Sequence, residues 1–224
     1  MNAKKAALIT CEAVGAEIEK VAPADLSIKV LEFGLHNHPN KLNQRLRECL
    51  DEVEGESGYQ VALFAYGLCS NGVVGLKPRR VKVVIPKVDD CISLFLGSRK
   101  EYGEQQRRDP GTFYLTKGWI EYGETPLAIY NQDVPWAKKY SPEQIHWVAR
   151  ETIKNYTRVA LIKTGAYDTL PYEDYARETA DLFGLKYEVL PGSLNLLKKL
   201  IYGHWDEDFV VVEPGTEITQ EMFL

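Results

Sequence analysis

The sequence has no apolar run approaching the roughly 20 residues that span a bilayer. Its first twenty residues, "MNAKKAALITCEAVGAEIEK", turn acidic before any apolar run reaches the length of a signal-peptide core. It also lacks long runs of like charge, with 27 Lys and Arg against 32 Asp and Glu, so nothing resembles the footprint of a nucleic-acid-binding protein. We therefore expect a cytoplasmic protein that binds neither membranes nor nucleic acids.

Several familiar site motifs are missing as well. The chain contains no C-x-x-C pair, no G-x-G-x-x-G sequence and no P-loop. It has only four cysteines in 224 residues, too few and too dispersed for a disulfide framework in a chain that can bury a sizeable core. The thiols are therefore expected to be buried, catalytic or metal-binding.

What the sequence does contain is an alternation of short β-rich runs with amphipathic helical patterns. Apolar runs of about five to eight residues between helices are typical of βαβ units around a buried parallel sheet. The class predicted is α/β. The expected strands of the first half lie in "KAALITC", "LSIKVLEFG", "YQVALFAYG" and "VKVVIP".

The strand and helix pattern restarts after residue 157, and the two halves match in places. "ALITC" corresponds to "ALIKT", "IKVLEFG" to "YEVLPGS" and "VALFAYG" to "FVVVEPG". The sequence thus predicts two pseudo-symmetric Rossmann-like lobes with parallel sheets, facing each other across a cleft. The expected divisions are an N-terminal lobe at 1–106, a connection with a linking helix at 107–156, and a C-terminal lobe at 157–224.

The connection is rich in Gly, Pro and aromatic residues and has little periodicity between residues 107 and 144. Two interpretations stay open, a lid over the cleft and a packed linker between the lobes. The segment ends at a predicted helix start, with Ser141 as the cap, Pro142 as the first helical residue and Gln144 as the reciprocal partner.

The four cysteines differ in their predicted positions. Cys49 falls on the apolar face of a helix, which predicts a small core residue. Cys11, Cys69 and Cys91 each follow the end of a predicted strand, and His36 occupies the matching place after the second strand. Because parallel strands of one sheet end along one edge, these four side chains are expected to converge there.

Three thiolates and an imidazole suit zinc, and three thiolates with an open position also suit an iron–sulfur cluster. We therefore predict a metal centre on Cys11, Cys69 and Cys91, with His36 as the further ligand. Cysteines that bind nothing, and a single nucleophilic cysteine, remain alternatives because the spacing is not specific.

A ligand site is predicted from the glycines and small residues at the strand ends. Such residues allow backbone N–H groups to approach a ligand, and a helix start suits an anion. Asp90 is included because it precedes Cys91, although capping the next helix explains it equally well. The candidate ligand-binding residues are Gly67, Ser70, Asn71, Gly72, Asp90, Gly165, Gly192 and Ser193.

Several segments resemble the family called domain of unknown function 1638. They are Cys11-Glu12, His36-Asn37 with Pro39, "YGLCSNG", Asp90-Cys91 before "ISLFLGSR", "PGTFYLTKGWIE" and "PGSLNLLKKLIYGHWDEDFVVVEPG". The resemblance covers nearly the whole chain. It implies no established activity, but implies an association with corrinoid-dependent methyltransferase proteins of anaerobes and thus with one-carbon metabolism.

Together these observations predict a metal- or iron–sulfur-binding accessory protein or enzyme in that metabolism. The alternative is a metal-free module that binds a small molecule or cofactor in the cleft, or a single-cysteine enzyme. Neither the metal nor the occurrence of catalysis follows from the residues alone.

Overall fold

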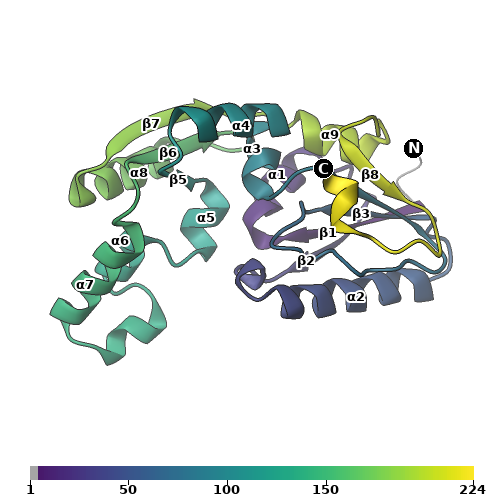
Figure 1. The fold of residues 1–224 in the computed structure, drawn as a ribbon, viewed down its shortest axis with the longest axis horizontal. Helices are drawn as coiled ribbons and strands as arrows, with labels where there is room; N and C mark the ends of the chain where they lie inside the picture. Colours follow the sequence, from purple (N-terminus) through teal and green to yellow (C-terminus); the bar gives the residue numbers. More distant parts are fainter. Residues whose placement is uncertain (1–4) are drawn as a thin grey trace.

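The computed structural model describes residues 5–224. It contains two sheets with helices packed around them (Figure 1). The first sheet has the strand order β2-β1-β3-β4-β8 and the second β5-β6-β7. All neighbouring strands are parallel except β4 and β8. The predicted α/β class is confirmed. The strands are β1 (Ala6–Cys11), β2 (Ser27–Leu31), β3 (Val61–Ala65), β4 (Lys82–Pro86), β5 (Thr112–Leu115), β6 (Arg158–Lys163), β7 (Lys186–Pro191) and β8 (Phe209–Val212).

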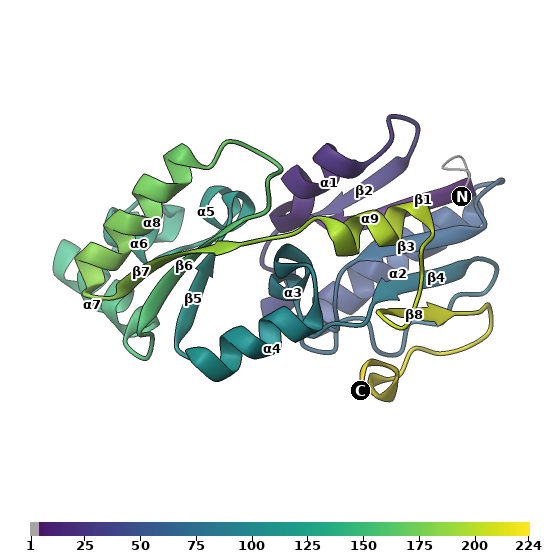
Figure 2. The same cartoon turned by 90° about the horizontal axis from the view of Figure 1, so that it is seen from above.

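Helices lie on both faces of the first sheet, and α8 packs on the second (Figures 1 and 2). The α-helices are α1 (Gly15–Val21), α2 (Pro39–Gly55), α3 (Cys91–Leu96), α4 (Arg99–Arg108), α5 (Lys117–Tyr122), α6 (Pro126–Tyr130), α7 (Pro142–Ile153), α8 (Leu170–Phe183) and α9 (Asn195–Tyr202). The short 3₁₀ helices include η2 (Glu12–Val14), η3 (Leu35–Asn37), η4 (Pro135–Lys139) and η5 (Gln220–Phe223). Within residues 5–224, no helix is both long and apolar enough to cross a membrane.

The alternation of side chains along β1 explains how the first sheet is buried on both faces. Leu8 joins the apolar cluster formed with α1, α3 and α9, while Ile9 packs on the opposite face, against α2. Both side chains are completely buried. Because successive residues of a strand point to opposite faces, a strand covered on both sides needs a continuous apolar run, which "AALITC" provides.

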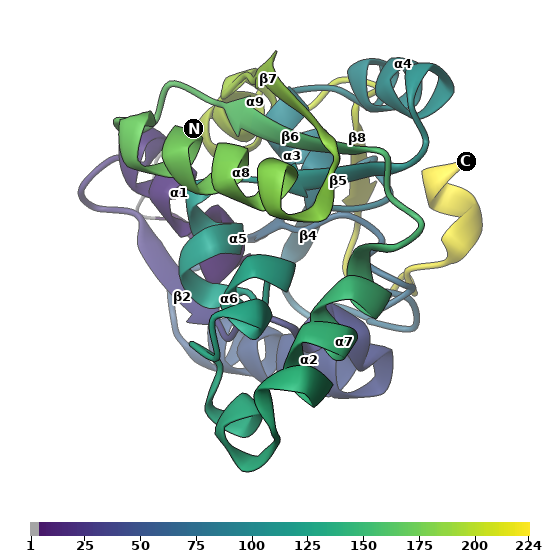
Figure 3. The ribbon, with the colours of Figure 1, turned by 90° about the vertical axis from the view of Figure 1, so that its left-hand side faces the viewer.

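The second sheet is joined to the first by a shared core. Val159 of β6 packs with Ala176 of α8, which covers one face of this sheet (Figure 3). The alternate residues Ala160 and Ile162 point the other way and belong to the same apolar cluster as Leu8. The two sheets therefore bury one continuous apolar surface between them.

The last strand differs from the prediction. The sequence comparison assigned 208–215 to the C-terminal lobe as the counterpart of the third strand. Instead, β8 pairs antiparallel with β4, with Val211 opposite Val84, in the first sheet. The physical reason is that α9 packs on α1, β3 and β4, so the chain has already returned to the first sheet when β8 begins.

The central segment is more ordered than its low periodicity suggested. It contains β5, which pairs in parallel with β6, followed by α5 and α6. It is therefore partly a strand of the second sheet, an outcome that neither the lid nor the linker interpretation included. The predicted helix start at Ser141 is confirmed, since Ser141 and Gln144 form a capping box at α7.

Candidate functional site

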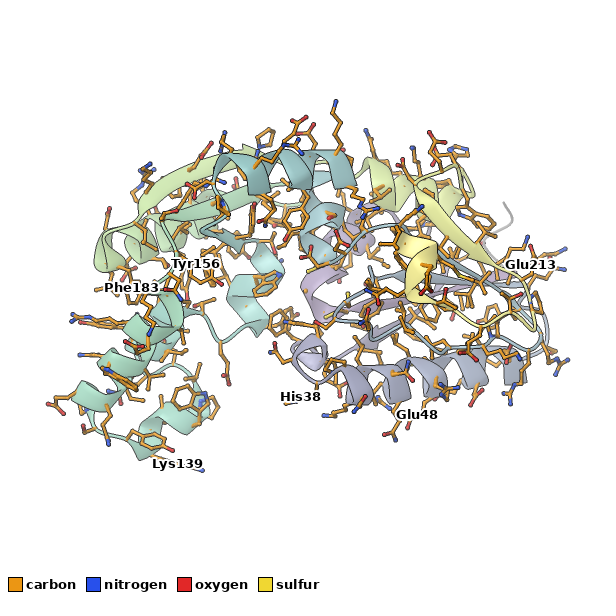
Figure 4. The ribbon with its side chains drawn as sticks, in the orientation of Figure 1. His38, Glu48, Lys139, Tyr156, Phe183 and Glu213 are labelled. Atoms are coloured by element: carbon orange, nitrogen blue, oxygen red, sulfur yellow. The ribbon has the colours of Figure 1, made fainter. Side chains whose placement is uncertain are left out.

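A pocket of about 380 Å³ lies at the carboxyl ends of the strands of the first sheet. One side is formed by the segments that follow β1, β2, β3 and β4. The other side comes from α4, from β5 of the second sheet, from α5 and from Tyr156, which is labelled in Figure 4 between α7 and β6. Ligands in open α/β sheets bind at this edge, so the location alone makes the pocket the candidate site.

The predicted convergence of sulfur and imidazole side chains is seen in the structure. Cys11 ends β1, His36 lies on η3, Cys69 follows β3 and Cys91 begins α3, and all four line the pocket. Cys49 behaves as expected, packing into the core from α2. Whether the four side chains act as ligands stays a prediction.

The candidate ligand-binding residues divide into two groups. Ser70 and Asp90 line the pocket, whereas Gly67, Asn71, Gly72, Gly165, Gly192 and Ser193 are not among its lining residues.

The glycines near Cys69 make room for protein atoms rather than for a ligand. A Cβ on Gly67 would lie 2.7 Å from the Val88 carbonyl oxygen and 2.9 Å from the Asp90 nitrogen. A Cβ on Gly72 would lie 2.4 Å from Leu42 Cδ2. The glycine at position 67 therefore lets the loop that carries Cys69 cross closely over the loop that carries Asp90.

Gly192 and Ser193 also serve the fold. The Gly192 N–H donates to the Lys163 carbonyl at 2.8 Å, and the Ser193 N–H donates to the Phe95 carbonyl at 2.9 Å. These two backbone donors are therefore already used within the protein.

The loop after β3 has an unusual backbone. Cys69, Ser70 and Asn71 have φ values of 46°, 57° and 67°, three successive non-glycine residues in the left-handed region. Each such residue costs about 1–2 kcal/mol in an L-amino-acid chain. Cross-loop bonds hold the segment, with the Leu68 and Cys69 N–H groups donating to Val88 and Asp89 at 2.8 Å each. Backbone strain of this kind clusters at functional sites.

Asp90 has two roles in the structure. Its Oδ1 accepts a 2.9 Å hydrogen bond from the Ile92 N–H and so caps α3, as the capping interpretation predicted. Its Oδ2 accepts a 3.1 Å bond from the Tyr102 hydroxyl on α4. Burial raises the pKa of the Asp90 carboxyl, while these hydrogen bonds oppose the rise. The carboxylate is thus oriented at the pocket wall by two separate helices.

The three pocket thiols are neutral at ordinary pH. Burial raises the pKa of Cys11 to about 11 and that of Cys69 to about 12, and it raises the pKa of Cys91 well above its usual range. The nearby Asp90 carboxylate raises the pKa of Cys91 further. A nucleophilic cysteine needs the opposite environment, one that favours the thiolate. Cys69 is 8% exposed and also packs on the core, but unlike Cys49 it reaches the pocket.

His36 is packed among aromatic rings. Its ring centroid lies 5.8 Å from those of Phe33 and Trp119, and the Phe33 and Trp119 centroids are 5.2 Å apart. Burial lowers the pKa of His36. The neutral imidazole that results is the form that can bind a metal.

Several polar atoms of the pocket walls have no hydrogen-bond partner. Within residues 5–224, this holds for the buried Tyr66 and Tyr114 hydroxyls. Among the same residues, the Trp119 indole N–H also makes no regular hydrogen bond, but it lies near the Cys91 thiol and lowers its pKa. Buried polar groups are nearly always paired, so each unpaired one calls for an explanation. These buried polar groups are therefore available to a ligand in the pocket.

The three thiols and the imidazole are of the types that bind a metal, but they are not arranged around a common point. Across the part of the chain that the structure describes, no group of three or more His, Cys, Asp or Glu side chains is close enough to hold a metal ion. The cysteines and His36 surround the pocket without forming a coordination shell. Coordination would therefore require these side chains to turn towards a common point.

The aromatic walls were not predicted from the sequence. The walls meet only in the folded chain, since they come from the loop after β3 and from α4, β5 and α5, which contribute Tyr66, Tyr102, Tyr114 and Trp119. The one signal that was present is the concentration of aromatic residues in "GTFYLTKGWIEY", which was interpreted as packing or as a lid.

The fold and the pocket define an α/β protein with a ligand-sized cavity at the carboxyl edge of a mostly parallel sheet. The profile of a protein family of unknown function, DUF1638, matches residues 30–201, about three quarters of the chain. The chain belongs to this family, as its sequence segments indicated. No curated protein and no solved structure matches the chain.

Proposed function

We propose that the protein binds a small molecule in this pocket, next to the thiols of Cys11, Cys69 and Cys91. The observation that carries the proposal is the pocket's composition. Segments from both sheets contribute to it, three of the four cysteines line it, and it contains an unpaired buried donor, the Tyr66 hydroxyl. Few convergent polar groups in a mostly apolar cavity are the usual features of a small-molecule site.

In the free protein, the thiols are suited to contact a bound ligand and are not suited to act as nucleophiles. Their raised pKa values keep them protonated, and a protonated thiol is a weak nucleophile. A positively charged group in the pocket would change this, because it would lower the pKa of each neighbouring thiol.

The proposal is tested by NMR of the tryptophan indole N–H groups during a screen of small fragments. Of the four tryptophans, Trp119 lines the pocket, and Trp147 lies 64% exposed on α7. Bound fragments should shift the Trp119 signal, identified by its loss in Trp119→Phe, and leave the Trp147 signal in place. A screen in which no fragment moves the Trp119 signal would contradict the proposal.

A second candidate function is a soft metal centre held by Cys11, Cys69 and Cys91 with His36. It is favoured by the meeting of three thiols and a neutral imidazole around one pocket, a donor set that suits zinc or an iron–sulfur cluster. The association with corrinoid-dependent methyl transfer belongs to this candidate, since zinc-bound thiolates serve alkyl transfer. Elemental analysis after oxygen-free purification tests it, with Cys49→Ala as the variant that should retain any metal.

A further inference from the structure

The residues that line the pocket carry charge of one sign. Asp90 is the carboxylate among its lining residues, and no lysine or arginine is among those lining residues in residues 5–224. Arg99, the first residue of α4, pairs with the neighbouring carboxylate instead, since its Nε lies 4.0 Å from Oδ2 of Asp89. Asp90 itself is held by neutral donors, the Tyr102 hydroxyl and the Ile92 N–H. Its negative charge therefore has no cationic partner at the pocket.

Aromatic rings line the same pocket as this carboxylate. Tyr102 and Tyr114 lie with ring centroids 6.1 Å apart beside it, and Trp119 packs edge-on to Phe33. Tyr66 completes the wall near Cys69. The faces of such rings carry negative partial charge and attract cations, most strongly in the case of Trp. Sites lined in this way are used to recognise quaternary ammonium groups.

We infer that the pocket binds a small organic cation of the quaternary or methylated ammonium class, with the aromatic walls around its methyl groups and Asp90 as its counter-charge. The inference rests on the proposed function and names the ligand class. An anionic ligand would meet Asp90 without any balancing basic side chain. A neutral ligand would leave the carboxylate buried and uncompensated, which is costly.

The thiols of the pocket are compatible with such a ligand. Cys11, Cys69 and Cys91 line the same pocket as Asp90 and the aromatic rings. Their polarisable sulfur atoms can pack against the methyl groups of the ligand.

The test is isothermal titration calorimetry of the full chain with two probes of the same shape. Choline carries the quaternary charge, and 3,3-dimethylbutan-1-ol replaces the charged nitrogen with carbon. Choline is expected to bind at least about tenfold more tightly than the alcohol. Equal affinities of the two probes would overturn the inference, because the charge would then contribute nothing.

Substitutions test whether the pocket residues bind choline. Asp90→Asn keeps a capping side chain at α3 and should weaken choline binding at least about tenfold, whereas Asp89→Asn, on the exposed neighbour, should not. Trp119→Leu should weaken choline binding similarly, with Trp147→Leu as its control. Choline binding that survives both pocket variants would overturn the inference.

The two proposals fail in different ways. If fragments move the Trp119 indole signal but choline does not bind, the pocket is a ligand site of another class and the cation inference is wrong. If neither fragments nor choline affect Trp119, both proposals are wrong.

Discussion

Thr164, at the end of β6, donates a 3.0 Å hydrogen bond to Oε1 of Glu17 on α1 and so ties the second sheet to a helix of the first. Both side chains are buried. Within the described residues, the other carboxyl oxygen of Glu17 has no partner. Burial raises the pKa of Glu17 from its usual 4.5 to about 7, although the hydrogen bond from Thr164 and the charge of Lys117 oppose the rise.

This pKa predicts a pH dependence of stability. The folded protein holds the Glu17 proton more tightly than the unfolded chain, so the contribution of Glu17 is full below about pH 4.5 and is lost as the pH rises through about 7. The total change is about 3 kcal/mol in the free energy of unfolding.

Urea unfolding at about pH 5 and about pH 8 measures this effect. Glu17→Gln cannot ionise, and it should reduce the stability lost between the two conditions by about 2 kcal/mol. Glu19→Gln, on the exposed side of the same helix, should leave the loss unchanged. Parallel behaviour of the two variants would show that Glu17 is not the titrating group.

The crossing of the two pocket loops predicts a large effect of Gly67→Ala. The added methyl group would lie 2.7 Å from the Val88 carbonyl oxygen, so one of the loops must move. We expect a loss of about 1–3 kcal/mol in the free energy of unfolding, measured by urea denaturation. Gly55→Ala, where a Cβ has no neighbour within 4 Å, should cause no such loss. Equal stabilities of the two variants would contradict the loop crossing.

The left-handed backbone at Ser70 predicts that glycine would be favoured there. Ser70→Gly should raise the free energy of unfolding by up to about 1 kcal/mol, since glycine adopts a φ of 57° without a steric penalty. Ser57, whose φ is not positive, gives the matched comparison, and Ser57→Gly should be slightly destabilising. A destabilised Ser70→Gly protein would mean that the loop is unstrained or that the serine side chain contributes more than the strain costs.

The protonated thiols make a specific prediction for metal binding. If zinc binds at Cys11, Cys69 and Cys91, each coordinated thiol must lose its proton, so binding should release protons to the buffer. Calorimetry in buffers of different ionisation enthalpy counts these protons. Cys69→Ala should release about one fewer than the unchanged protein, and Cys49→Ala should release the same number. Zinc binding without proton release would exclude these thiols as the ligands.

The sequence was enough to predict that four side chains meet at one edge of the sheet, those of Cys11, Cys69, Cys91 and His36. This prediction depends only on parallel strands ending at the same edge. That logic needs approximate strand positions, and the long apolar runs of β1, β3 and β4 provided them. Coordination distances did not follow, because they depend on side-chain rotamers.

Two other features could not be predicted from patterns in the sequence. The place of β8 depends on the packing of α9 against the first sheet, a tertiary contact that no local periodicity reports. The four-residue β5 is too short for a clear alternation, although it brings Tyr114 to the pocket. The aromatic wall, and with it the ligand class inferred for the site, was therefore visible only in the folded chain.

The most direct test of the central claim is a crystal structure of the oxygen-free protein soaked with the fragments that shift the Trp119 signal. We expect non-protein density between Trp119, Cys69 and Asp90, in contact with aromatic faces. A pocket closed by its own side chains, or fragment density elsewhere on the molecule, would contradict it.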